Sequence, residues 1–130
     1  MDFEKFTERA RGFIQSAQSF ALSSSNQLFT PEHLLKILLD DEEGMAQSLI
    51  RAAGGRPQEV KQATDMALSK LPKVQGGSGQ VYLAPETSKV FDLAQDLAKK
   101  AGDSFVTAER LLQALAMSTG TPSTSTMAMR

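Results

Sequence analysis

Thr30-Pro31-Glu32-His33-Leu34-Leu35-Lys36-Ile37-Leu38 decides the fold, because the chain uses this segment twice. Moved 77 residues along, it aligns with Thr107-Ala108-Glu109-Arg110-Leu111-Leu112-Gln113-Ala114-Leu115, and five of the nine positions are identical. Thr is a favoured N-cap, and Glu in the first turn stabilises the positive end of the helix dipole. The leucines then recur at helical spacing. Each copy is therefore predicted to be a capped amphipathic helix.

The helix upstream of each segment repeats at the same offset. Five apolar positions of the first copy match five of the second, namely Phe13, Ile14, Ala17, Phe20 and Ala21 with Val90, Phe91, Ala94, Leu97 and Ala98. Gaps of three and four residues predict long helices over 3–22 and 85–101. A chance likeness between two amphipathic helices would not preserve the core face and the cap together. The sequence therefore predicts an all-α fold made of two pseudo-repeats of a helical bundle.

The two copies are expected to differ in length. In the first repeat (1–71), helices over 45–53 and 58–71 follow the acidic loop 40–44. A Gly-containing linker (72–84) comes next, with a short hairpin around Val74 and Val81 as a further interpretation. The second repeat (85–130) ends in a Ser/Thr-rich segment with no room for a fourth helix, so it is predicted to be incomplete. Residues 75–80 and the tail are expected to be mobile.

Composition excludes several classes of function. The net charge is −1, with 14 basic and 15 acidic residues well mixed, whereas nucleic-acid binding needs a basic face. There is no Cys, which excludes disulfides and thiolate zinc sites. The chain shows no secretory signal and no run of 18 apolar residues, so a cytoplasmic location is expected. There is no P-loop motif, and a non-catalytic domain without a cofactor is predicted.

Two polar features have ordinary interpretations. His33, the single histidine, has no partners at metal-ligand or acid–base spacing. We expect it to be a partly exposed helix residue. The stretch from Asp40 to Glu43 lacks the alternating oxygen ligands of a calcium loop and is predicted to be solvated.

The repeated pattern of a long helix followed by Thr-x-Glu-[His/Arg]-Leu-Leu-x-x-Leu resembles the Clp N-terminal repeat domain, which precedes the ATPase modules of Clp/AAA+ unfoldases. The start of the chain, 1–7, and the stretch 67–74 look like those of ClpB-type disaggregases, and 101–105 matches the family's Gly-Asp-aromatic join. The resemblance covers about residues 1–117. It implies a homohexameric parent ATPase that uses ATP and Mg and cooperates with a DnaK-type chaperone system. The isolated domain is expected to be a monomer.

The second long helix suggests where a client would bind. Its apolar arc spans roughly 160°, wider than a core-facing stripe requires. Phe91 and Leu93 lie near opposite edges of that arc and can form a shallow groove, with Tyr82 and Phe105 close by. The alternative is that neighbouring helices cover these edges.

Three polar residues are candidates for the rim of that groove. Asp103 and Glu109 would form an acidic rim, which Thr7 could join. Stabilisation of the helix dipole accounts for Glu109 equally well, and Thr7 can be an ordinary polar position.

These features together predict a substrate-recognition domain of a protein disaggregase. A shallow apolar patch with a polar rim would bind unfolded or aggregated polypeptides weakly, with a Kd of about 1 μM to 1 mM. Two alternatives remain: an adaptor-docking domain of a protease-linked unfoldase (ClpA/ClpC type), and a free-standing helical regulatory domain.

Overall fold

The computed structural model describes residues 3–74 and 80–118. The Gly-rich segment 75–79 and the Ser/Thr-rich end lie outside the described residues, and so do the predictions of mobility and of an incomplete second repeat made for them. The described elements, in chain order, are a short 3-10 helix η1 (Phe3–Lys5), α1 (Glu8–Ser23), β1 (Leu28–Phe29), α2 (Pro31–Leu39), α3 (Met45–Ala52), α4 (Pro57–Ser69), β2 (Tyr82–Leu83), α5 (Pro85–Lys100) and α6 (Ala108–Met117). The predicted all-α class is confirmed. In the described ranges, no helix is long and apolar enough to cross a membrane.

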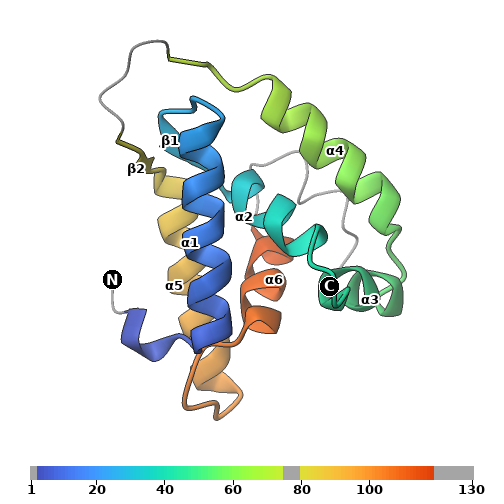
Figure 1. Ribbon diagram of the computed structural model, residues 1–130. Helices are drawn as coiled ribbons and strands as arrows, with labels where there is room; N and C mark the ends of the chain where they lie inside the picture. The colour runs from blue at the N-terminus through green and yellow to red at the C-terminus, as the bar shows by residue number, and fades with distance from the viewer. Residues whose placement is uncertain (1–2, 75–79, 119–130) are drawn as a thin grey trace.

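The sequence repeat is also a repeat of helices. The first and last residues of α5 each lie 77 positions after those of α1, and α6 begins 77 positions after α2. Within each copy, the long helix packs against the short one. The two long helices run side by side, with α2 and α6 against them, while α3 and α4 extend the first copy on its far side (Figure 1).

Two short backbone pairings join the copies. Strands β1 and β2 are parallel, with Phe29 opposite Leu83, and an isolated parallel bridge joins Phe6 to Val106. Phe6 and Leu83 are equivalent positions of the repeat, and so are Phe29 and Val106. Both pairings therefore join the same two positions, with the copies exchanged. The residues that lead into each long helix therefore pair with those that lead into the short helix of the other copy. Backbone hydrogen bonds from Thr7 N to Val106 O (2.9 Å) and from Ala84 N to Phe29 O (3.1 Å) fix both pairings.

The predicted hairpin around Val74 and Val81 is wrong. The partner of β2 is β1, which lies more than fifty residues earlier, and Val74 N donates to Ser25 O at 2.9 Å. Val74 and β2 therefore both pair with the segment that follows α1. A local pattern of valines and glycines cannot show such a distant strand partner.

The first helix begins later than the periodicity of Phe3 and Phe6 predicts. Phe6 is in the bridge to Val106, and Thr7 is the N-cap of α1, with its Oγ1 accepting from Ala10 N at 3.1 Å. The segment before the cap is therefore η1 and not the first turn of α1. The three-residue spacing of the two phenylalanines matches the period of this 3-10 turn.

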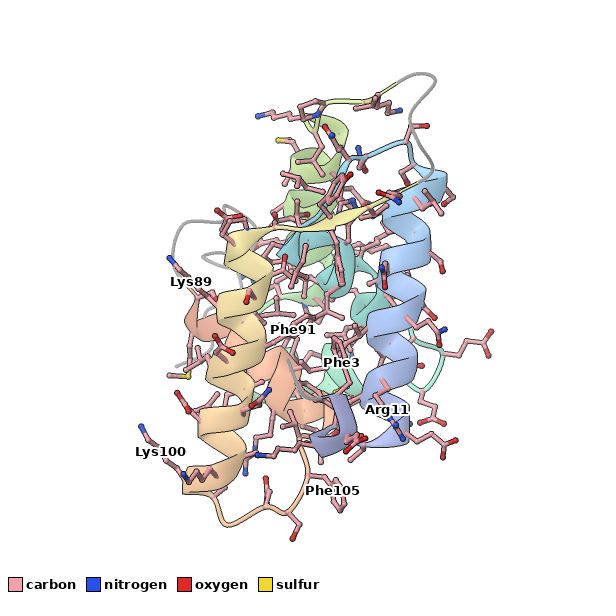
Figure 2. The ribbon with its side chains drawn as sticks, turned by 90° about the vertical axis from the view of Figure 1, so that its left-hand side faces the viewer. Phe3, Arg11, Lys89, Phe91, Lys100 and Phe105 are labelled. Carbon is pink, nitrogen blue, oxygen red and sulfur yellow. The ribbon has the colours of Figure 1, made fainter. Side chains whose placement is uncertain are left out.

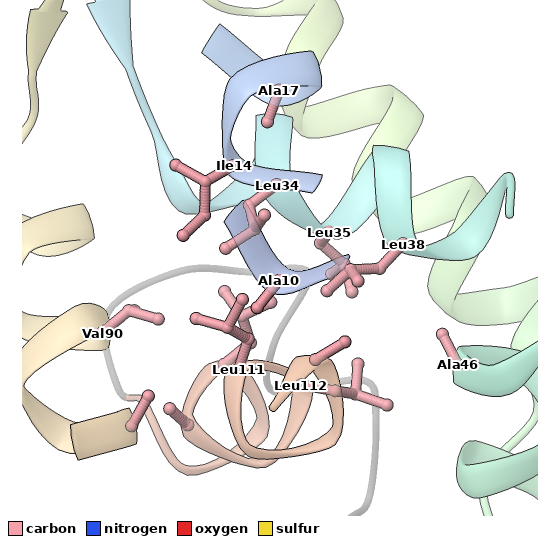
Figure 3. Close-up of a cluster of buried hydrophobic side chains, with 14 of the residues drawn as sticks. Ala10, Ile14, Ala17, Leu34, Leu35, Leu38, Ala46, Val90, Leu111 and Leu112 are labelled. Carbon is pink, nitrogen blue, oxygen red and sulfur yellow. The ribbon is translucent and has the colours of Figure 1, made fainter. Parts of the chain in front are cut away.

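A single core lies between the copies. The long helices contribute Phe91 and smaller side chains such as alanine and valine to it, and the short helices contribute mainly leucines (Figure 3). The side chains labelled in this cluster are Ala10, Ile14, Ala17, Leu34, Leu35, Leu38, Ala46, Val90, Leu111 and Leu112, all 5% exposed or less. Burying each large aliphatic side chain contributes about 1.5–3 kcal/mol, and both copies supply such side chains to this one core.

Candidate functional site

Phe91 is not at the surface, which corrects the groove predicted from the apolar arc of α5. Its ring is 0% exposed and is contacted by three other rings, with centroids 6.0 Å away at Phe3, 6.0 Å at Phe6 and 6.2 Å at Phe29. Leu93 is partly buried and packs against the core. The helical period of α5 shows that its arc is wide, but it cannot show that the N-terminal segment covers one edge.

Four of the exposed large apolar side chains lie along the seam between α1 and α5, and the exposed Leu22 and Leu28 flank Tyr82 at one end of it. Phe3 is 40% exposed, Tyr82 52%, Leu83 44% and Phe105 54%. We call this set the seam face. In Figure 2, the segment containing β2 crosses between α5 and α1, Phe3 lies below it in the middle, and Phe105 projects at the far end. The seam face is therefore an interrupted apolar track and not a continuous groove.

Tyr82 and Phe105 lie at opposite ends of α5. That helix has 16 residues, which at 1.5 Å per residue separate its ends by about 24 Å. The two rings cannot contact the same side chain of a client. They can contact the two ends of one extended segment.

Two of the three predicted rim residues, Thr7 and Asp103, lie beside Val106, next to Phe105. Thr7 donates its backbone N–H to Val106 O, and Asp103 Oδ2 accepts from Arg110 Nε at 3.0 Å. Glu109 is exposed on the first turn of α6. The structure therefore brings Thr7 and Asp103 to the same end of the seam, and Thr7 is also the N-cap of α1. Glu109 lines a different groove, together with Leu49, Ala53 and Met117.

Arg9 on α1 forms ion pairs with the acidic loop. Its guanidinium donates to Glu43, an interaction that raises the pKa of Arg9; burial opposes the rise, and the charges of Asp41 and Glu109 add to it. Arg9 also donates to Asp41 at 2.9 Å and stacks on the ring of Phe13, 5.3 Å from its centroid. The acidic loop is therefore tied to α1 through Asp41 and Glu43, while Asp40, Glu42 and Glu43 remain exposed, as predicted for a solvated loop.

An open groove beside Phe105 gives this end of the seam its mixed chemistry. The residues that line it come from η1, from the end of α5 and from the join to α6, and they include Lys5, Gln95, Asp96, Lys99, Asp103 and Phe105. One ring beside amide and charged groups suits a ligand with both apolar and polar parts. Within the described residues no three His, Cys, Asp or Glu side chains are grouped to hold a metal.

His33 is fully buried, so its predicted partial exposure is wrong. Its Nδ1 accepts from Thr30 N at 2.9 Å, which leaves the proton on Nε2 to donate to Asn26 Oδ1, also at 2.9 Å. Asn26 Nδ2 in turn donates to Pro72 O at 3.3 Å. Burial lowers the pKa of His33 to about 4.

One feature of the sequence could have indicated the buried pair of Asn26 and His33. Asn26 and His33 are seven residues apart, as are Asp103 and Arg110 at the repeat offset. A hydrogen-bonding pair at the same position of both copies indicates a conserved geometry within the repeat.

Comparisons with known proteins agree with this architecture. The model of the Clp repeat (R) N-terminal domain matches residues 5–127. The chain is 65% identical over 117 residues to the chaperone protein ClpB of Brucella suis, covering 90% of this chain and 13% of that protein. Against the ClpB of Rickettsia felis the identity is 45% over 116 residues. The chain therefore spans about one seventh of the length of these relatives.

Two known structures share the fold at low sequence identity. The Hsp104 N-terminal domain from Candida albicans superimposes with a TM-score of 0.82 at 19% identity, covering 97% of this chain and 83% of that one. The N-terminal domain of the ClpV1 ATPase from E. coli gives 0.83 at 19% identity, covering 98% and 79%. These two likenesses show the fold alone.

Proposed function

The chain belongs to the Clp repeat N-terminal domain family, and on that premise we propose that it recognises unfolded or aggregated polypeptide segments for a protein-remodelling motor. The observation that carries this proposal is the seam face, where Phe3, Tyr82, Leu83 and Phe105 are each at least 40% exposed. Single exposed apolar residues are common on soluble proteins, but four along one seam indicate a binding surface.

The spacing of these side chains suits an extended client. An extended chain advances about 3.3 Å per residue, so about seven residues would cover the roughly 24 Å between Tyr82 and Phe105. The gaps between the rings allow many sequences to bind, since only a few client side chains need be apolar. Such contacts give a Kd of about 1 μM to 1 mM, or about −8 to −4 kcal/mol.

The polar rim would bind the client's backbone and charged groups. Asp103 offers carboxylate oxygens that can accept from amide, lysine or arginine donors in the groove that Phe105 lines. Glu109, exposed on the first turn of α6, offers a second carboxylate. Arg110 already holds Asp103 at 3.0 Å, so a client donor would share that carboxylate and not find it empty. This arrangement favours weak binding and rapid release.

The activity of the whole protein is a further part of the proposal. The ClpB relatives are about seven times longer than this chain, and we place the ATP- and Mg-dependent motor in the remainder of such a protein. In a homohexameric ring, six tethered weak sites would raise the effective concentration of client without trapping it. We also propose that such a protein cooperates with a DnaK-type system and is cytoplasmic, because the relatives that support the proposal are ClpB chaperones.

The proposal can be tested by titrating an unfolded model protein into the isotope-labelled chain. We expect amide shift changes at Phe3, at β2 and around Phe105. If these residues stay silent while the acidic loop from Asp40 to Glu43 responds, the surface is that of an adaptor-docking domain and the proposal fails.

Two matched substitutions measure the contribution of one ring. Phe105→Ser should weaken binding by about threefold to tenfold, the effect of losing one partly exposed aromatic contact. Met66→Ser is the control, because Met66 is 61% exposed on α4, far from the seam. Equal losses in both variants would show that general surface hydrophobicity, and not the seam face, binds the client.

A further inference from the structure

A cluster of phenylalanine rings runs from the surface into the core beneath the seam face. Phe3 lies 5.7 Å from Phe6 and 6.0 Å from Phe91, and Phe91 lies 6.2 Å from Phe29. Phe3 is 40% exposed, whereas Phe6 is 1% and Phe91 0% exposed. Phe3 is therefore the outermost ring of the cluster, and Figure 2 shows it between α5 and α1, next to Phe91.

The backbone of Phe3 lies outside the pairing that joins the two copies. The bridge to the second copy begins at Lys5, whose carbonyl accepts from Val106 N at 2.7 Å, and continues at Thr7. Phe3 lies outside this bridge and is joined to it by one turn, in which Phe6 N donates to Phe3 O at 3.1 Å. The ring can therefore leave Phe91 without breaking the pairing between the copies.

The second copy shows that the repeat does not require a ring at this position. The residue 77 positions after Phe3 is Gln80, which is exposed and accepts from Tyr82 Oη at 3.1 Å. The strand pairing is the same in both copies although one has an aromatic ring there and the other an amide. The pairing between the copies therefore does not depend on a ring at position 3.

We propose that Phe3 occupies a binding pocket for an aromatic or long aliphatic side chain of an unfolded polypeptide. The floor of the pocket is formed by the rings of Phe6 and Phe91. Phe3 stands in for the client, and a client side chain replaces it by making the same edge-on ring contacts. This inference rests on the proposed function and adds to it a central apolar pocket between Tyr82 and Phe105.

Competition by Phe3 lowers the affinity for clients. While the ring is seated, the pocket is closed, and the apparent Kd rises in inverse proportion to the fraction of molecules with an open pocket. The same competition favours release, because Phe3 returns as the client leaves. A pocket of this kind accepts any large apolar residue, which suits clients without a common sequence.

Removal of the ring tests the inference. The probe is reduced, carboxymethylated α-lactalbumin, which stays unfolded, and its Kd is measured with this chain by fluorescence anisotropy. Phe3→Ala should bind about fivefold tighter than the natural chain, whereas Phe3→Leu, which refills the pocket, should bind nearly as the natural chain does. Met66→Ala should leave the Kd unchanged. An unchanged or weaker Kd for Phe3→Ala would mean that Phe3 is part of the surface and not a competitor.

A second measurement does not depend on the stability of that variant. The natural chain is labelled with 4-fluorophenylalanine, and the Phe3 signal is assigned by its loss in Phe3→Leu. Saturation with the probe should move the Phe3 signal to its solvent-exposed position. A signal that stays in place while the probe binds overturns the pocket but leaves the proposed function intact.

Failure of the proposed function has a different signature. In that case the natural chain does not bind the unfolded probe at all. The small ligand N-acetylphenylalaninamide should still shift the Phe91 ring signals of Phe3→Ala, but not those of the natural chain, if the pocket exists. The two failures are therefore distinguishable.

Discussion

The two copies treat one pair of positions in opposite ways. Asn26 and His33 in the first copy are 7% and 0% exposed, and they are joined by a 2.9 Å hydrogen bond. Asp103 and Arg110, at the repeat offset, form an ion pair of 3.0 Å with about a third of each side chain exposed. The backbone places a donor and an acceptor in contact in both copies, while the surroundings decide whether they carry charge.

Burial explains the choice of residues. In the first copy, the rings of Phe20 and Phe29 lie against His33, and Pro72 contributes the carbonyl that accepts from Asn26. A charged pair taken out of water there would need to recover a large desolvation free energy, so neutral and fully hydrogen-bonded groups are favoured. In the second copy, water screens the charges and the ion pair contributes little.

Exchanging the residues between the copies should give the largest effect. His33→Arg places a guanidinium in the buried site without a carboxylate, and we expect it to lower the free energy of unfolding by about 4 kcal/mol. The mirror change, Arg110→His, should cost less than about 1 kcal/mol because the site is partly exposed. Urea denaturation of both variants measures the difference. Equal losses would show that the copies do not differ in burial.

Acid should act on stability through the buried histidine of the first copy. The pKa of His33 falls from about 6.5 in the unfolded chain to about 4 in the folded one, so the unfolded state binds more protons between these values. The free energy of unfolding is therefore full above pH 6.5 and should decrease by about 3 kcal/mol as pH falls to 4.

The single histidine makes this test direct. Its ring-proton NMR signal should titrate near pH 4 in the folded state, and His33→Gln should remove its share of the acid sensitivity. A midpoint near 6.5 in the folded chain would contradict the buried neutral pair.

The turns after the long helices offer a smaller comparison. Ser25 and Gly102 occupy the same repeat position, with φ of 59° and 78°, the left-handed region that favours glycine. Ser25→Gly should stabilise the chain by up to about 1 kcal/mol, and Gly102→Ser should destabilise it by a similar amount. Thermal unfolding measures both. Shifts of the same sign would show that side-chain contacts outweigh the backbone at one of the turns.

The smallest effect is expected for the exposed ion pair. Asp103→Asn should lower the free energy of unfolding by about 0.5 kcal/mol at low salt, and 1 M NaCl should abolish the difference. Denaturation at two salt concentrations checks this. A loss that persists in high salt would mean that the carboxylate is more buried than its exposure shows.

Prediction from the sequence succeeded where the pattern was local. The helical period and the caps at Thr30 and Thr107 located the helices, and the offset of 77 identified the repeat. These successes depend on interactions within a few residues along the chain.

Prediction failed where distant segments meet. Phe91 lies on the edge of a wide apolar arc, yet the rings of Phe3 and Phe6 cover it. His33 follows a helix cap, yet the chain near Pro72 crosses to its hydrogen-bond partner. In each case the decisive contact comes from residues tens of positions away.

The sequence by itself determined that this chain is a twice-used pair of helices, because helical period, capping and repetition are properties of neighbouring residues. Only the tertiary structure decided that the copies are joined by exchanged strand pairs, that one pair of equivalent positions is neutral and the other charged, and that Phe3 covers Phe91. The reason is physical: burial depends on which segments pack together, and the free energy of burial, not the residue type alone, decides which side chains remain available to a client.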